Sequence, residues 1–257
     1  MSDLLKRVLT AVVLFVVLGP IVFIGGKLLE FAVLFFSLEL CHELIGAFKH
    51  KGYYIPEHYI LFSCVIHFVV FELQWPAFLA FSVSTFLLVL FFLRHEDFTL
   101  DDAGICLLIL VYIPYFLFPI IYLDDTYYLY LVFIIAIFTD TFAYFTGRAF
   151  GKHKLCPSIS PNKTVEGAVG AVIGTEIVGL IYCAVVGLGV TLPHILFIGV
   201  ASVTAQLGDL FASKIKRSTG IKDFGHFLPG HGGFLDRFDS ILMIIPMVYM
   251  LYRFPLL

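Results

Sequence analysis

The stretch AGICLLILVYIPYFLFPII occupies residues 103–121 and contains no Asp, Glu, Lys or Arg. As a helix rising about 1.5 Å per residue, it would nearly span the hydrocarbon core of a bilayer, which is about 30 Å thick. The whole chain has the same character, since 60% of its 257 residues are apolar and 14% are charged. A soluble domain is usually about 45–50% apolar and about 25% charged. The composition therefore excludes an ordinary soluble globule, a disordered chain and a secreted disulfide scaffold, and it predicts a polytopic membrane protein.

Further apolar segments of similar length lie on both sides of this stretch, separated by charge clusters and by Pro or Gly. The predicted fold class is an all-α polytopic membrane protein with about nine transmembrane helices. The predicted spans are Val8–Ile24, Leu28–Phe48, Tyr59–Leu73, Trp75–Leu93, Ala103–Ile121, Leu129–Phe145, Gly167–Leu188, Ile195–Phe211 and Phe238–Phe254.

The placement of basic residues tests this count independently. With a cytoplasmic N-terminus and nine spans, 14 of the 16 Lys and Arg residues fall on the inner side, and only Lys27 and Arg253 fall outside. Short cytoplasmic loops carry such an excess of Lys and Arg. We therefore expect the N-terminus in the cytoplasm and the C-terminus outside, in a membrane that we take to be the bacterial inner membrane.

Two long polar interruptions, 146–166 and 212–237, both fall on the predicted cytoplasmic face. We accordingly divide the chain into an N-terminal transmembrane region, 1–128, with about five spans, and a catalytic region, 129–257, which carries both loops. The net charge of -3 offers no general basic surface, so we expect no nucleic-acid partner.

The richer of the two loops begins at the inner end of the eighth span. Asp209, Ser213 and Lys216 follow the i, i+4, i+7 spacing of one helix face. A carboxylate at the edge of a bilayer is costly unless a cation compensates it. A dense group of basic side chains continues the segment: Lys214, Lys216, Arg217 and Lys222.

A glycine-rich run, Pro229-Gly-His-Gly-Gly233, comes next. Glycines at this density let backbone N–H groups approach an anion, and the following helix, expected near Asp236, would add its positive N-terminal end. Asp236 and Asp239 lie at i and i+3 and would share a helix face. Carboxylates beside a phosphate-binding loop are suitable ligands for Mg²⁺, which prefers oxygen ligands together with substrate phosphates.

A second polar cluster surrounds the other loop. Asp140, Tyr144 and Gly147 are spaced along one helix face near the inner end of the sixth span. An acidic residue within a span is a functional candidate by default. The loop then contains Ser160-Pro-Asn-Lys163-Thr164 and Glu166, in which Lys163 could bind phosphate as a point charge or serve only as a positively charged membrane anchor.

A third patch consists of Glu39, His42 and Glu43 in the second span. These side chains could line a substrate cavity or pair with basic groups on another helix, and we favour the pairing.

These motifs resemble the signature of the phosphatidate cytidylyltransferase (CDP-diacylglycerol synthase) family. The matching elements are Ser213-x3-Arg217, Lys222-Asp223, Leu228-Pro-Gly-His-Gly-Gly233 and Asp236-Arg-x-Asp239, with a second block formed by Asp140, Tyr144, Ser160–Thr164, Glu166 and Gly167. They cover about a quarter of the chain, and the N-terminal half matches only in general character.

The resemblance implies transfer of CMP from CTP to phosphatidate, which yields CDP-diacylglycerol and pyrophosphate for phospholipid biosynthesis. It implies Mg²⁺ as cofactor, with a second, monovalent cation left open, and it suggests a homodimer. The expected catalytic residues are Asp209, Asp236, Asp140 and Lys222, and the expected metal ligands are Asp209, Asp236, Asp140 and Asp239. The expected substrate-binding residues are Ser213, Lys216, Arg217, Gly230, His231, Gly232, Gly233, Arg237, Ser160, Lys163, Thr164 and Glu166.

Two other functions stay open at this stage. A membrane transporter for a phosphorylated anion would place polar groups on both faces, whereas the outer loops here are short and nearly uncharged. A related enzyme could also act on another lipid phosphate.

Overall fold

The computed structural model describes residues 3–225, 227 and 232–254, with side chains from residue 12 onward. The chain forms two compact units. Unit 1 comprises Met1–Asp124 and Ser218–Arg237, and unit 2 comprises Asp125–Arg217 and Phe238–Leu257. The glycine-rich segment is therefore grouped with the N-terminal helices, although it lies within the catalytic region predicted from the sequence.

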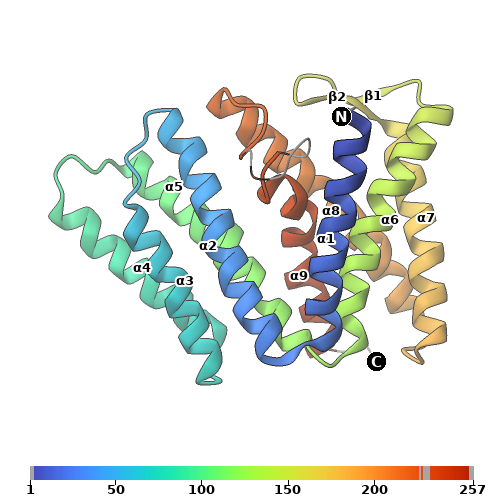
Figure 1. Cartoon of the computed structure of the whole chain (residues 1–257), viewed down its shortest axis with the longest axis horizontal. Coiled ribbons are helices and arrows are strands. Elements are labelled where there is room, and N and C mark those ends of the chain that lie inside the picture. Colours follow the sequence, from blue (N-terminus) through green and yellow to red (C-terminus); the bar gives the residue numbers. More distant parts are fainter. Residues whose placement is uncertain (1–2, 226, 228–231, 255–257) are drawn as a thin grey trace. The chain divides into compact units, whose positions relative to one another are not determined.

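Unit 1 is built from antiparallel helices joined by short loops. Its helices are α1 (Asp3–Ile24), α2 (Gly26–His50), α3 (Glu57–Glu72), α4 (Ala77–Arg94) and α5 (Leu100–Leu110). Consecutive helices pack on one another, and Figure 1 shows α2, α3 and α4 side by side. The apolar stretch 103–121 begins in α5 and continues as a π-helical turn, η1 (Val111–Tyr115), and a 3₁₀ segment, η2 (Phe118–Leu123). Each irregular segment contains a proline, Pro114 or Pro119, which lacks the N–H that an α-helix requires.

Unit 2 contains α6 (Tyr127–Phe150), a two-stranded antiparallel hairpin of β1 (Lys154–Cys156) and β2 (Ser160–Thr164), α7 (Val165–Val185) and most of α8 (Leu192–Thr219) and α9 (Leu235–Arg253). The last residues of α8 and the first of α9 belong to unit 1. The predicted all-α class therefore describes the scaffold, to which the hairpin adds a small strand element.

Within the described residues, six helical segments are long and apolar enough to cross a membrane: Gly26–His50, Ala77–Arg94, Leu100–Leu123, Tyr127–Phe150, Val165–Val185 and Leu192–Thr219. The chain is thus an all-α polytopic membrane protein. The predicted third span corresponds to α3, a shorter helix of 16 residues.

The two polar interruptions are shorter than the sequence predicts. Helix α6 continues to Phe150 and α8 continues to Thr219, so Ser213 and Lys216 are helical and do not lie in a loop. Hydropathy marks where apolar side chains end, whereas a helix continues through Lys, Arg and Ser, which a helix accommodates at little cost. The end of each apolar run was therefore the wrong place to end the helix.

Helices α6 and α7 approach each other closely at glycines. A Cβ added to Gly167 would lie 2.8 Å from the carbonyl oxygen of Ala143, and one added to Gly170 would lie 2.5 Å from the side chain of Thr146. Only glycine permits this backbone approach. The close approach brings the C-terminal end of α6 and the N-terminal end of α7 together next to the hairpin, where the candidate site lies.

Candidate active site

A pocket of about 440 Å³ lies in unit 2 among α6, the hairpin, α7 and α8. It contains four predicted site residues: Asp140, Lys163, Thr164 and Asp209. The other lining residues are Ala143, Tyr144, Gly147, Arg148, Leu155, Asn162, Gly167, Ala168 and Gln206. Residues that are 69 positions apart in the sequence, Asp140 and Asp209, therefore line one pocket.

Helical spacing explains how α6 contributes to this pocket. Asp140, Tyr144 and Gly147 all line it, which confirms the predicted shared face. Arg148 donates a hydrogen bond from Nη1 to the hydroxyl of Tyr144, at 3.0 Å. The C-terminal part of α6 thus brings a carboxylate, a phenol and a guanidinium to one wall.

Asp209 on α8 faces the pocket with both carboxylate oxygens engaged. Oδ2 forms an ion pair with Nζ of Lys163 on β2, and Oδ1 accepts a hydrogen bond from the Ser213 hydroxyl at 3.3 Å. The second contact confirms that Asp209 and Ser213 share a helix face. Both members of the ion pair are partly exposed, with side chains 25% and 31% accessible for Lys163 and Asp209. Solvent and ligands can therefore reach the pair.

Asp239 extends this acidic group. Asp239 is only 7% exposed to solvent. The negative charges of Asp209 and Asp140 repel its carboxylate, and the positive charge of Lys216 attracts it. Lys216 is itself 9% exposed. Three of the four predicted metal ligands, together with one buried lysine, therefore interact within unit 2.

This group suits a hard divalent cation chemically, because carboxylates that repel one another are stabilised by additional positive charge. Within the described residues, however, no three His, Cys, Asp or Glu side chains are already arranged around a common metal position. The carboxylate of Asp239 therefore interacts with those of Asp140 and Asp209, but within the described residues the three do not form a complete metal-binding site.

Asp236, the fourth predicted ligand, lies in unit 1 at the start of α9. Its Oδ2 accepts two backbone hydrogen bonds, from the N–H groups of Phe224 and Gly233, both at 2.9 Å. The carboxylate therefore links two backbone positions, Phe224 and Gly233, that lie nine residues apart in the sequence. Gly232 adopts φ +80°, a left-handed conformation that favours glycine.

The sequence predicts a phosphate-binding loop at residues 229–233, of which the structure describes Gly232 and Gly233. Gly233 donates its N–H to Asp236, and the next two N–H groups are donated to Glu43 of α2. Three consecutive amides at the start of α9 thus bind carboxylates of the protein itself. Gly230 and His231, also predicted to bind substrate, lie outside the described residues.

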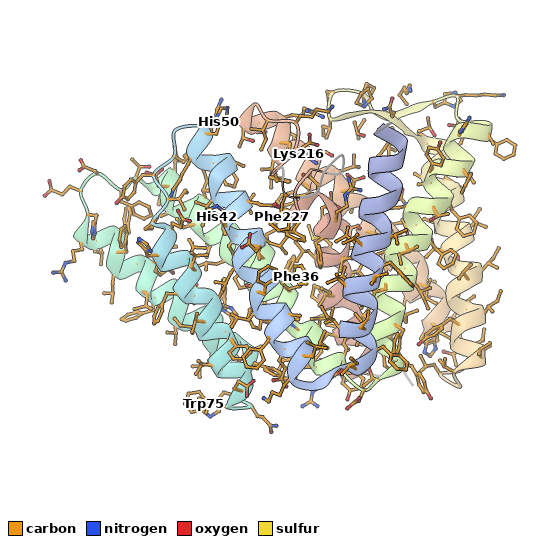
Figure 2. The ribbon with its side chains drawn as sticks, in the orientation of Figure 1. Phe36, His42, His50, Trp75, Lys216 and Phe227 are labelled. Carbon is orange, nitrogen blue, oxygen red and sulfur yellow. The ribbon has the colours of Figure 1, made fainter. Side chains whose placement is uncertain are left out.

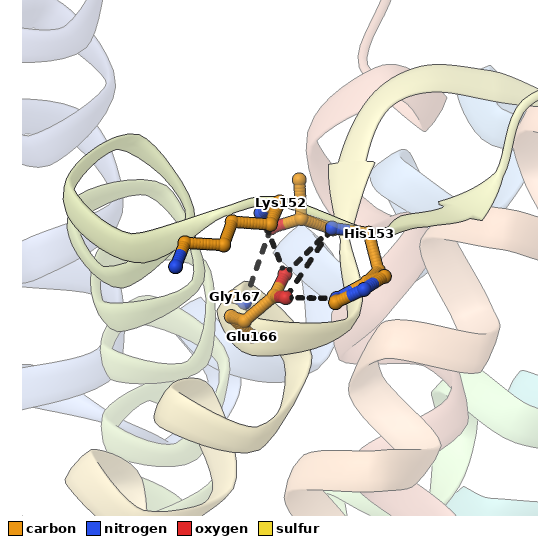
Figure 3. Close-up of polar contacts among 5 residues, drawn as sticks. Lys152, His153, Glu166 and Gly167 are labelled. Atoms are coloured by element: carbon orange, nitrogen blue, oxygen red, sulfur yellow. Dashed lines mark hydrogen bonds and ion pairs between the residues drawn. The ribbon is translucent and has the colours of Figure 1, made fainter.

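Two predicted substrate-binding residues have structural contacts. Thr164 is buried and caps α7, where its hydroxyl accepts the N–H of Gly167 at 3.1 Å. Glu166 accepts hydrogen bonds from the N–H groups of Lys152 and His153 at 3.0 and 3.2 Å, and its Oε1 lies 2.6 Å from Nδ1 of the His153 ring (Figure 3). Both side chains hold the hairpin connection on α7.

The remaining predicted residues lie at the edges of these groups. Ser160 begins β2 and is half-buried, whereas Arg217, Lys222 and Arg237 are exposed. Arg217 ends the portion of α8 in unit 2, and Lys222 and Arg237 belong to unit 1.

Several pocket residues were absent from the sequence-based set of candidates. Arg148 and Gln206 both line the pocket. Their spacing carried a signal, because Arg148 follows Tyr144 by four residues and Gln206 precedes Asp209 by three. The sequence analysis favoured a basic partner for Glu43, and this prediction is wrong. Its carboxylate accepts hydrogen bonds from the backbone N–H groups of Phe234 and Leu235.

The chain is similar to known proteins over nearly its whole length. A model of the cytidylyltransferase family matches residues 5–255. A phosphatidate cytidylyltransferase of Staphylococcus saprophyticus is 36% identical over 95% of this chain and 97% of its own length. Proteins of the same name from Staphylococcus haemolyticus and Bacillus subtilis are each 34% identical, over 95% and 98% of this chain and 97% and 98% of their own lengths. The chain therefore belongs to the cytidylyltransferase family.

Proposed function

We propose that the protein is a phosphatidate cytidylyltransferase, which transfers CMP from CTP to phosphatidate and releases CDP-diacylglycerol and pyrophosphate. The relatives that carry this name match almost the full chain, including the N-terminal half, where the sequence motifs are uninformative. This match favours the enzyme over the transporter considered above. The observation that carries the proposal is the shared pocket of Asp140, Lys163 and Asp209, which places acidic and basic groups suited to a nucleoside triphosphate together.

The reaction is an in-line displacement at phosphorus. An anionic phosphate oxygen of phosphatidate forms a bond to the α-phosphorus of CTP, the bond from that phosphorus to the bridging oxygen breaks, and pyrophosphate leaves with the electron pair. Because the attacking oxygen is already anionic, the reaction depends on positioning and charge neutralisation more than on a strong base.

The chain's cations have distinct positions for this task. We assign Lys163 to the triphosphate, because it reaches into the pocket from β2 and its partner Asp209 can exchange it for another cation. Lys216 is buried near Asp239, so we assign it to charge compensation within the acidic group. Lys222, Arg217 and Arg237 are exposed basic residues that we assign to substrate phosphates.

Mg²⁺, when bound, would neutralise charge on the triphosphate. We propose as its ligands the four aspartates that the sequence motifs indicate: Asp140, Asp209, Asp236 and Asp239. The repulsion of Asp239 by Asp209 and Asp140 supports this proposal.

The proposed topology has nine spans, a cytoplasmic N-terminus and an external C-terminus in the bacterial inner membrane. The distribution of Lys and Arg supports it. The active site then faces the cytoplasm, where CTP is available, while phosphatidate stays in the inner leaflet. A homodimer is part of the proposal by family resemblance.

The test uses the purified full-length protein in vesicles with CTP, phosphatidate and Mg²⁺. We expect pyrophosphate release with equimolar CDP-diacylglycerol, and loss of both products when EDTA is added. Parallel reactions with another lipid phosphate, such as a polyprenyl phosphate, test the substrate. Turnover of that lipid alone would contradict the proposed substrate, and turnover in excess EDTA would contradict the proposed cofactor.

A further inference from the structure

Glu43, in the C-terminal third of α2, binds the start of a helix that lies nearly 200 residues later in the chain. Its Oε1 accepts the N–H of Phe234 at 2.9 Å, and its Oε2 accepts the N–H of Leu235 at 2.7 Å. The residue is 8% exposed. The first N–H groups of a helix have no partner within the helix, and a carboxylate at this end also interacts favourably with the helix dipole. Glu43 therefore caps α9 from outside it.

The surrounding backbone encloses this carboxylate. A Cβ added to Gly225 would lie 2.5 Å from Oε1 of Glu43, and one added to Gly233 would also collide with the carboxylate. The Cβ added to Gly225 would also lie 3.2 Å from the Cα of Gly233, so the backbones of these two glycines lie close together. The absence of a side chain at Gly225 and Gly233 thus allows the backbone at both positions to lie against the Glu43 carboxylate.

The neighbouring carboxylate of Asp236 shares this arrangement. Three consecutive amides are divided between the two acids, since Gly233 donates to Asp236 while Phe234 and Leu235 donate to Glu43. The charges of Glu43 and Asp236 repel each other. The hydrogen bonds from the backbone amides favour the charged form of both carboxylates and so offset part of this repulsion. The position of Asp236 therefore depends on the amides that Glu43 holds.

Aromatic packing strengthens the same connection. The ring of Phe234 packs against Phe36 of α2, with centroids 5.5 Å apart, and against Phe227, at 4.9 Å. Figure 2 labels Phe36 and Phe227 within this region of unit 1. The apolar contact shields the hydrogen bonds of Glu43 from water, which strengthens them electrostatically.

We propose that Glu43 is a positioning residue of the active site: its carboxylate caps α9 and fixes the segment that carries Asp236. The proposal rests on the proposed function for its catalytic consequence. A residue of the N-terminal helices then helps to position residues 233–236. The sequence motifs, in contrast, place all the chemistry in the other half of the chain.

The test compares Glu43→Gln with Glu39→Gln. The first keeps the shape of the side chain but replaces one acceptor oxygen with an NH₂ group that opposes a backbone N–H. The control removes a like charge one turn earlier on the same helix, where it repels Glu43 but accepts none of the three amides. For Glu43→Gln we expect about a 10- to 100-fold fall in kcat with a smaller change in the KM for CTP, as is typical when a supporting hydrogen bond is lost. Glu39→Gln should stay within about twofold of the wild type.

Hydrogen exchange measured by mass spectrometry supplies a readout that does not depend on activity. In Glu43→Gln, peptides covering 232–238 should exchange faster while those of α3 and α7 stay unchanged. Glu43→Asp, which keeps the charge but is shorter, should recover part of kcat. Wild-type kcat and exchange in Glu43→Gln would overturn the proposal, as would a general rise in exchange across all helices. If the wild type makes no CDP-diacylglycerol, the proposed function fails, while the exchange data still test the cap.

Discussion

Carboxylates lie in two regions of the molecule, the pocket of unit 2 and the start of α9 in unit 1. The groups that stabilise these carboxylates differ between the two regions. In the pocket, Asp209 pairs with Lys163, and elsewhere in unit 2 the charge of Lys216 attracts Asp239. At the start of α9, Asp236 and Glu43 are held by backbone N–H groups. A lysine on a flexible stem can change partners when a phosphate arrives, whereas a backbone amide cannot leave without changing the fold. The first region is therefore suited to exchanging ligands and the second to holding a shape.

The largest effect should come from removing an aspartate of either region. Asp209→Asn and Asp236→Asn should each lower kcat/KM by at least about 100-fold, because each removes a proposed ligand of the cation that neutralises the triphosphate. Formation of CDP-diacylglycerol measures the loss.

Hydrogen exchange distinguishes the two variants. Only Asp236→Asn should accelerate exchange around Phe224 and Gly233, since only Asp236 accepts their N–H groups. Unchanged turnover in Asp236→Asn would remove that residue from the site, and equal exchange in both variants would abolish the contrast between the regions.

Lys163→Met should have the next largest effect. It removes a positive charge from the pocket, and we expect the KM for CTP to rise about 10- to 100-fold, because hydrogen bonds to charged groups contribute about 1.5–3 kcal/mol. Lys154→Met, on the adjacent strand β1, changes an exposed lysine that does not line the pocket and should be nearly neutral. Initial rates across a range of CTP concentrations measure both variants.

The ion pair itself can be tested by combining the changes. Lys163→Met and Asp209→Asn should be non-additive in the double variant, because the two side chains contact each other directly. Full additivity would show that the ion pair has no energetic role in catalysis.

Gly167→Ala tests the scaffold beneath the pocket. The added methyl group would lie 2.8 Å from the carbonyl oxygen of Ala143, so α6 and α7 must separate, which should cost about 1–3 kcal/mol of stability. Gly104→Ala in α5 is the matched control, since no atom lies within 4 Å of its added Cβ. Thermal unfolding in detergent measures the difference, and equal midpoints for the two variants would argue against close packing at Gly167.

Thr164→Ala should have the smallest effect. It removes the cap of α7 and should destabilise the protein by about 1 kcal/mol, whereas Thr164→Ser keeps the hydroxyl and should be close to wild type. If Thr164→Ser instead lost activity while remaining stable, Thr164 would have a role in substrate binding beyond capping.

Local sequence patterns predicted the shared helix faces correctly. The spacing of Asp140, Tyr144 and Gly147 placed them on one wall of the pocket, and that of Asp209 and Ser213 placed them in hydrogen-bonding contact. Both patterns depend only on the 3.6-residue period of a helix. The ends of α6 and α8 were predicted too early, because hydropathy does not report where a polar helix continues.

Contacts between distant segments could not be predicted in this way. The sequence offered a phosphate cradle at the glycines before α9, and it offered Glu43 as the partner of a basic group. In the structure Glu43 instead binds the amides of Phe234 and Leu235, directly after these glycines. No periodic pattern connects residues almost 200 positions apart.

The amino-acid sequence by itself determined that the chain crosses a membrane, which residues share a helix face and which motifs carry acidic and basic groups, because composition and helical period act within a single segment. Tertiary structure alone decided which group each carboxylate contacts. Lys163 forms an ion pair with Asp209, and backbone N–H groups donate hydrogen bonds to Glu43 and Asp236. The partner of a buried charge is set by how helices pack, and packing depends on glycine contacts and side-chain shapes that are spread across the whole chain.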